Sequence, residues 1–295
     1  MSMLGNNFVI CNGYTSPFIE RKKLIFYHIP KSAGTTICNI LSTLLDDSFR
    51  LLGPLTSNSG FGTHRPQITS EEYFIKERNN IENKNFIYGH FSINLYNFFL
   101  NSLSITLIRN PIDRSFSHYN FQAQRGIIDT NTNLKDCFDE GFIPDNIITR
   151  QFSGNLNSKL DIEDYHLALK NLENKINIIF DFDNSKSLIN YIISIYDLPN
   201  VIFQNQQITK NKYLKKNQEN INIIKIFNKY DFELFKEIKE KGLFFIPPED
   251  KKVRIKNKTL FWSQNDPVYG NTKMLINKEV EEIINYMNKN NLSKS

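Results

Sequence analysis

The stretch FYHIPKSAGTTI, from Phe26 to Ile37, combines one lysine, one glycine and three small hydroxyl side chains. A glycine lets the backbone approach a ligand closely, and the lysine adds a full positive charge. If a helix begins just after this loop, its first N–H groups and the positive end of its dipole favour an anion there. The stretch therefore predicts a binding site for a phosphate group or a similar anion.

The position of the lysine leaves the ligand of this loop open. In the nucleoside triphosphatase loop, GxxxxGK[ST], the lysine follows the glycines, and an acidic residue on another strand holds Mg²⁺. Here Lys31 precedes Gly34 by three residues, and no predicted strand ends in an obvious aspartate for the metal. Taken alone, the loop fits a nucleotide kinase or another nucleoside triphosphatase, a non-catalytic module that binds a nucleotide or a polyanion, or an ordinary tight turn.

A second motif, LIRNPIDRSFSHY, contributes Arg109 and, eight residues later, Ser117. Neighbouring strands of a parallel sheet end at the same edge, so Arg109 can reach a second phosphate from the edge that holds Lys31, and Ser117 can donate to it from the following helix. Between the two motifs, His90 ends the run NFIYGH. An imidazole is well matched to the work of a general base near neutral pH.

The elements that must position these residues follow from local patterns. Short apolar runs predict buried strands, and apolar residues at helical spacing predict the helices between them. Pro111 is expected in the first turn of its helix, and Gly242 at the end of the last one. The predicted strands are 24–29, 85–90, 104–109 and 176–182, and the predicted helices are 35–45, 111–125, 161–174, 185–198 and 217–242. This alternation indicates a three-layer α/β fold like that of the P-loop nucleoside triphosphatases, with a central parallel sheet flanked by helices.

Composition narrows the function classes. The 295 residues carry a net charge of +5, which suits an anionic ligand but falls short of a nucleic-acid footprint. Three widely spaced cysteines, Cys11, Cys38 and Cys137, favour reduced thiols over a disulfide framework or a zinc site. We find neither a signal-peptide pattern at the N-terminus nor an apolar run that could span a bilayer, so we expect a soluble, cytoplasmic protein.

Together, the motifs resemble those of sulfotransferases that use 3′-phosphoadenylyl sulfate (PAPS). FYHIPKSAGTTI looks like their 5′-phosphosulfate loop, and ITLIRNPIDRSFSHY is similar to their 3′-phosphate motif. The closer likeness is to bacterial-type members of the carbohydrate sulfotransferase family that includes the heparan sulfate 2-O-sulfotransferases. In those enzymes a Gly-His pair supplies the catalytic base, and here Gly89 and His90 match it. The likeness extends loosely over residues 24–242, the predicted sulfotransferase domain, between an N-terminal extension (1–23) and a C-terminal extension (243–295) that is packed on or appended to it.

The resemblance implies in-line transfer of a sulfuryl group from PAPS to an acceptor hydroxyl, with His90 as the base and Lys31 at the bond that breaks. The product is adenosine 3′,5′-bisphosphate (PAP), and the chemistry requires no metal ion. The implied acceptor is a carbohydrate, such as a glycan or glycolipid. His64, on a predicted loop, is a candidate to line the acceptor cleft, and Arg150 and Lys210 are substrate-binding candidates through the resemblance alone. The implied cofactor-binding residues are Lys31, Ser32, Ala33, Gly34, Thr35, Thr36, Arg109 and Ser117.

The sequence also departs from this pattern. The 2-O-sulfotransferases carry a further histidine two residues before the base, where this chain has Tyr88. Asn110 stands where aspartate is commoner, and the membrane anchor of the animal enzymes has no counterpart here, so their Golgi location does not carry over. Of the other histidines near the motifs, we expect His28 to be mainly structural and His118 to face elsewhere on its helix.

Overall fold

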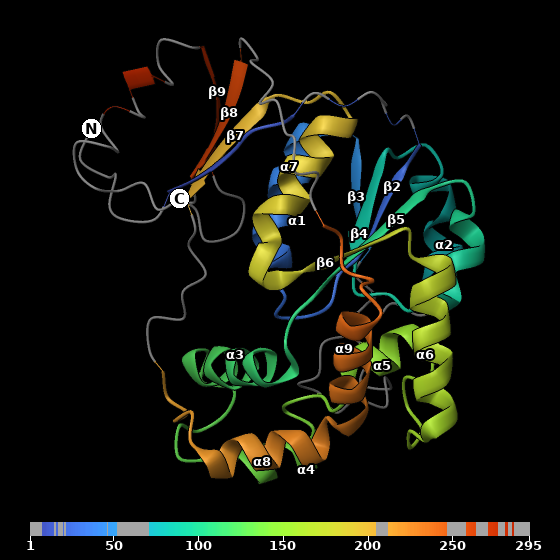
Figure 1. The fold of residues 1–295 in the computed structure, drawn as a ribbon, viewed down its shortest axis with the longest axis vertical. Helices are drawn as coiled ribbons and strands as arrows, with labels where there is room; N and C mark the ends of the chain where they lie inside the picture. The colour runs from blue at the N-terminus through green and yellow to red at the C-terminus, as the bar shows by residue number, and fades with distance from the viewer. Residues whose placement is uncertain are drawn as a thin grey trace.

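A computed structural model describes residues 8–14, 16, 20, 22–45, 47–51, 71–204, 212–246, 258–263, 271–276, 281–282 and 285. Its centre is a five-stranded sheet in the order β3-β4-β2-β5-β6 (Figure 1). Every neighbouring pair in this sheet is parallel, which confirms the predicted central parallel sheet. The strands are β2 (Leu24–Tyr27), β3 (Ser48–Leu51), β4 (Phe86–Gly89), β5 (Leu103–Ile108) and β6 (Ile178–Asp181).

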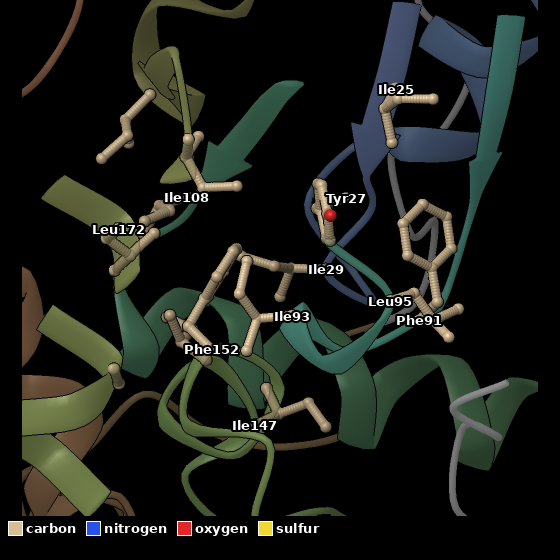
Figure 2. Close-up of a cluster of buried hydrophobic side chains, with 14 of the residues drawn as sticks. Ile25, Tyr27, Ile29, Phe91, Ile93, Leu95, Ile108, Ile147, Phe152 and Leu172 are labelled. Atoms are coloured by element: carbon tan, nitrogen blue, oxygen red, sulfur yellow. The ribbon is translucent and has the colours of Figure 1, made fainter. Parts of the chain in front are cut away.

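The inner strands β2, β4 and β5 are buried on both faces, which explains why they read as nearly continuous apolar runs. Ile25 and Tyr27 point into one core cluster, shared with α2 (Glu71–Ile81), α5 (Ile147–Ser153), α6 (Ile162–Lys175) and α9 (Lys229–Glu240). Leu24 and Phe26 point into another, shared with α1 (Gly34–Leu44) and α7 (Ser185–Ile195). Figure 2 shows part of the first cluster, where Tyr27 lies near Phe91 and Phe152. The two clusters make the predicted three layers.

A third cluster lies beyond the carboxyl ends of the strands, where β5 leads directly into α3 (Pro111–Gln124). It joins α3 to α4 (Leu134–Asp139) and α8 (Gln218–Phe227), which lie together at the lower edge of Figure 1. Pro111 occupies the first turn of α3 as predicted, and the side chain of Asn110 caps the helix by accepting a hydrogen bond from the N–H of Ile112 (2.9 Å). The α3 helix is thereby placed across the edge at which the predicted functional residues gather.

The single long helix predicted over 217–242 is wrong, because two helices, α8 and α9, meet there at Asn228. The buried amide of Asn228 accepts hydrogen bonds from Arg114 (3.2 Å) and from the backbone N–H of Asn146 (3.1 Å). Its Nδ2 atom also donates to the carbonyl of Ile224 in the preceding turn (3.1 Å), and such a local bond competes with regular helix geometry. The predicted end of the helix is confirmed: Gly242 has φ 63°, and the next N–H bonds back to Ile238 (3.0 Å).

A second sheet was not predicted. It has the order β1-β7-β8-β9, with β1 (Phe8–Cys11), β7 (Asn200–Gln204), β8 (Lys258–Ser263) and β9 (Asn271–Ile276). β1, from the predicted N-terminal extension, and β8, from the predicted C-terminal extension, both pair with β7, and β9 pairs with β8. Cys11, Val201 and Leu260 of this sheet join the core cluster of α1 and α7. The predicted domain limits remain predictions. Short 3₁₀ helices, η1 (Ile93–Phe99) and η2 (Phe182–Asn184), follow β4 and β6. Within the described ranges, no helix combines the length and apolar character needed to cross a membrane.

Candidate active site

The loop between β2 and α1 has a strained backbone. Lys31 (φ 69°) and Ala33 (φ 51°) both adopt the left-handed conformation, which costs a residue other than glycine about 1–2 kcal/mol. Successive changes of hand turn backbone N–H groups toward one concave side, as in known anion-binding nests. Ala33 is the N-cap of α1, and no side chain of the described residues caps the helix. The first N–H groups of α1 therefore face the loop and can receive an anion.

Three cations gather at this loop. Arg109, just after β5, donates a hydrogen bond to the carbonyl of Lys31 (3.1 Å). The Nζ atom of Lys31 lies 3.8 Å from the centroid of the Phe121 ring, and the Cζ atom of Arg125 lies 4.4 Å from the same centroid. Burial, and then the charges of Arg109 and Arg125, lower the pKa of Lys31 to about 8. Such mutual repulsion is relieved when an anion binds.

Carboxylates neutralise this cluster only in part. Among the residues that the structure describes, none forms an ion pair with Lys31 or Arg109 within 4 Å. Arg109 instead rests on the Phe182 ring, with its Cζ atom 4.2 Å from the ring centroid. Asp113 and Asp183 offset part of the charge of Arg109 without pairing with it directly. The positive charge that remains attracts a multiply charged anion.

His90 follows β4 and lies against His28, which follows β2. Their ring centroids are 4.7 Å apart and the rings are tilted by 43°. Burial is the main cause that lowers the pKa of His90 to about 4, and the charge of Arg50 adds to it. Burial also lowers the pKa of His28 well below its ordinary value, with smaller contributions from His90, Arg50 and Lys31. Both imidazoles are therefore neutral at pH 7, as a general base must be before it accepts a proton.

Two glycines make room for this arrangement. A Cβ atom on Gly34 would lie 1.8 Å from Nε2 of His28, so the ring of His28 lies against the backbone of the loop. A Cβ atom on Gly89 would lie 2.0 Å from the carbonyl oxygen of Leu51 in β3. Glycine precedes His90 because β3 and β4 approach each other too closely there for any side chain.

The model of the sulfotransferase family matches residues 18–236 of the chain. This protein belongs to the sulfotransferase family. Among solved structures it is similar to a sulfotransferase from Alicyclobacillus acidocaldarius, with 8% identity and a TM-score of 0.40 over 75% of this chain and 96% of the other. It is also similar to a retinol dehydratase in complex with retinol and PAP, with 14% identity and a TM-score of 0.34 over 80% and 74% of the two chains. None of the curated proteins matches the sequence significantly.

The remaining predicted cofactor-binding residues of this sulfotransferase lie around the loop. Ser32 is buried, and its hydroxyl has no hydrogen-bond partner within the described residues, while Thr36 is buried in the first turn of α1. The side chain of Thr35 lies outside what the structure describes. Ser117 is half-buried on α3, one helical turn before Phe121, and so shares the helix face that contacts Lys31.

Of the three substrate-binding candidates, the structure describes only Arg150. His64 and Lys210 lie outside the described residues. Arg150 is buried in α5, where it donates to both carboxylate oxygens of Asp145 (3.2 and 2.8 Å) and to the carbonyl of Ser158 (2.8 Å). This guanidinium holds the start of α5 to the segment after it, and its role toward a substrate remains a prediction.

Several residues of the site were missed by the sequence reasoning. Phe121 and Arg125 follow Ser117 at intervals of four, and this spacing on one helix face was the signal that could have found them. No local pattern marks Arg50, which lines a small pocket with His28, His90, Tyr88, Cys38 and Asn39. We expected His118 to face elsewhere, but it is buried. Burial lowers its pKa, and so does the charge of Arg114. Lys31 and His90 lie near enough to lower it further.

Proposed function

We propose that this sulfotransferase uses PAPS as its donor and transfers the sulfuryl group in line to a hydroxyl of an acceptor, with His90 as the general base. The observation that carries the proposal is the cluster of Lys31, Arg109 and Arg125, unpaired with carboxylates among the described residues, beside a neutral histidine. A donor with a 5′-phosphosulfate and a 3′-phosphate needs positive charge at two places. The loop and the start of α3 offer both.

Lys31 and the backbone N–H groups from Ala33 to Thr36 are proposed to bind the 5′-phosphosulfate, with Ser32 contributing its hydroxyl, because the N–H of Ser32 already donates to the carbonyl of Ile29 (3.2 Å). As the bond between sulfur and the bridging oxygen breaks, negative charge grows on the leaving phosphate, and a preorganised cation stabilises it. Arg109 and Ser117 are proposed to bind the 3′-phosphate. The hydrogen bond from Arg109 to the carbonyl of Lys31 ties the two phosphate-binding regions together.

His90 is proposed to take the proton of the acceptor hydroxyl as the oxygen attacks sulfur. With a pKa of about 4, His90 is a weak base in the ligand-free protein. A negatively charged donor bound at Lys31 stabilises the imidazolium form and raises this pKa. The base therefore becomes effective when the donor is in place.

The acceptor is proposed to be a carbohydrate hydroxyl, on the strength of the motif resemblance. The small pocket beside His28 and His90, with Arg50 at its wall, would receive the reacting hydroxyl and not the whole sugar. A screen of the host's glycans, glycolipids and small metabolites with radiolabelled PAPS tests this part of the proposal. Labelling of only non-carbohydrate alcohols would refute the carbohydrate assignment and leave the donor assignment standing.

Calorimetry with PAP tests the donor assignment. We expect the wild-type protein to bind PAP, Arg109→Ala to lose this binding, and ATP to compete poorly. Arg78→Ala is the matched control, because Arg78 is exposed on α2 and pairs only loosely with Glu82 (3.6 Å). Tight, Mg²⁺-dependent binding of ATP with no response to PAP would show that the loop serves a nucleoside triphosphate.

A separate substitution tests the base. We expect His90→Ala to bind PAP as the wild type does and to lose sulfuryl transfer by a factor of about 10²–10⁴, the usual contribution of general base catalysis. His166→Ala, which removes an exposed histidine of α6, is the control and should be fully active. If transfer survives in His90→Ala, the base has been misassigned.

A further inference from the structure

We propose that His28 is a positioning residue that holds the ring of His90 in the orientation needed for proton abstraction. The inference rests on the proposed function, because it concerns the same base. The sequence indicated a mainly structural role for His28, with a part in orienting the site as the lesser alternative. The structure places its ring against the ring of His90, with the centroids 4.7 Å apart.

The two histidines come from neighbouring strands whose register brings them together. Tyr27 pairs with Gly89 in the parallel β2–β4 ladder, so the next residues, His28 and His90, emerge side by side at the carboxyl edge. The backbone N–H of His28 donates to the carbonyl of Gly89 (3.1 Å), which extends the ladder by one more bond. The positions of both Cα atoms are therefore set by the sheet.

Gln151 fixes the same backbone from the opposite side. Its buried amide donates to the carbonyl of Phe91 (2.9 Å) and more weakly to the carbonyl of His28 (3.4 Å). One side chain of α5 thus clamps the segments that carry both histidines. With the backbone held, rotation about the side-chain bonds is the main freedom left to His90, and contact with a second ring restricts that rotation.

His28 is itself held in place by the phosphate loop. Its ring lies against the Cα atom of Gly34, and its buried Nε2 atom has no hydrogen-bond partner among the described residues. The ring thus lies between the loop and His90. Because it is neutral, it can stand beside His90 when His90 becomes an imidazolium, whereas a lysine or arginine there would repel the new charge.

Tyr88 does not serve this purpose from its position two residues before the base. Its ring stacks on Phe86, with the centroids 4.9 Å apart and the planes at 18°. Its hydroxyl interacts with Ser42 on α1. Burial and Cys38 raise the pKa of Tyr88, while Arg50 and this interaction with Ser42 lower it. The positioning histidine is therefore supplied by the end of β2.

Nuclear magnetic resonance of ¹³C-labelled histidine provides the test. The chain contains only five histidines, so His90→Ala identifies the signal of His90. We expect His28→Ala to shift and broaden the His90 signal and to slow the cleavage of PAPS by water about tenfold, a size typical of a misoriented catalytic group. PAP affinity should change less than about threefold, because the phosphate-binding residues remain. Added imidazole should enter the vacated space and restore both the signal and the rate.

One outcome would overturn the proposal. An unchanged His90 signal in His28→Ala would overturn it whatever happens to the rate of PAPS cleavage. If cleavage slows while that signal stays the same, the cause is general destabilisation and not a misoriented His90. If His28→Ala does not fold, His28→Asn fills more of the space, and the same signal decides the question. His166→Ala, with and without imidazole, is the control. Failure of the wild type to bind PAP would refute the proposed function, while the signal of His90 in the ligand-free variants would still test the contact with His28.

Discussion

Replacement of Gly34 by alanine is the sharpest test of how the loop and the histidines are packed. The added Cβ atom would lie 1.8 Å from Nε2, 2.0 Å from Cδ2 and 2.3 Å from Cε1 of His28. All three distances are far below van der Waals contact, so the imidazole has to move. Because His28 touches His90, we expect the displacement to reach the base as well.

Two effects of opposite sign determine the change in stability. Overpacking a well-filled site costs about 1–3 kcal/mol, whereas replacing glycine by alanine in a helix gains up to about 1 kcal/mol, and Gly34 is the first residue of α1. We therefore expect Gly34→Ala to lower the free energy of unfolding by about 1–2 kcal/mol. In the His28→Ala background the clash is gone, so the same substitution should be neutral or stabilising by up to about 1 kcal/mol.

A double-mutant cycle measured by urea unfolding gives the coupling between the two residues, which should be about 2 kcal/mol. Gly126→Ala is the matched control, since Gly126 has φ 68° and no atom within 4 Å of the added Cβ. Its cost of about 1 kcal/mol arises from the backbone alone, and it should be equal in both backgrounds. If Gly34→Ala destabilises the protein equally with and without His28, the ring is not the obstacle and the reasoning fails.

Three further predictions concern charge. Lys31 has a pKa of about 8 without ligand, and a bound anion raises it. PAP affinity should therefore be level from about pH 7, where the phosphates of PAP are ionised, to about pH 8, and fall by up to about tenfold per pH unit above that. Lys31→Arg should abolish this fall in calorimetry, and a wild-type profile that stays level past pH 9 would contradict the assignment. Arg125→Gln should move the fall to higher pH, because one of the charges that lower the pKa of Lys31 is lost; an unchanged midpoint would exclude Arg125 from the site. Asp231→Ala should reduce the free energy of unfolding by about 3–5 kcal/mol. The reason is that the buried carboxylate accepts hydrogen bonds from the backbone and hydroxyl of Thr149 (2.7 and 2.8 Å) and offsets the buried charge of Arg114. A loss below about 1 kcal/mol in urea unfolding would show that the site relaxes.

Local pattern was sufficient for most of the central domain. The apolar runs that became β2, β4 and β5 are buried on both faces, and such burial leaves a continuous signal within a few residues. Arg109 was predicted at the edge shared with Lys31 because parallel strands end together. The hydrogen bond between these two residues is consistent with that rule.

Local pattern failed where the deciding partner is distant in sequence. Residues 217–242 have helical periodicity throughout, but hydrogen bonds from Arg114 and Asn146 to Asn228 divide them into two helices. The second sheet joins residues 8–11 to 200–204 and 258–263, segments too short and too far apart to predict one another. Strand pairing of this kind is specified by the register and packing of the folded chain.

The sequence by itself determined which residues could bind an anion, and from them it predicts the kind of ligand: a loop with Lys31 ahead of its glycine, an arginine at a neighbouring strand end, and a histidine between them. These depend on residue type and on spacing within single elements, which the chain carries before it folds. Only the tertiary structure decided that His28 touches His90 and that Arg125 joins Lys31 on the ring of Phe121. The physical reason is that both contacts cross between elements, so they depend on strand register and on the placement of α3 across the sheet edge.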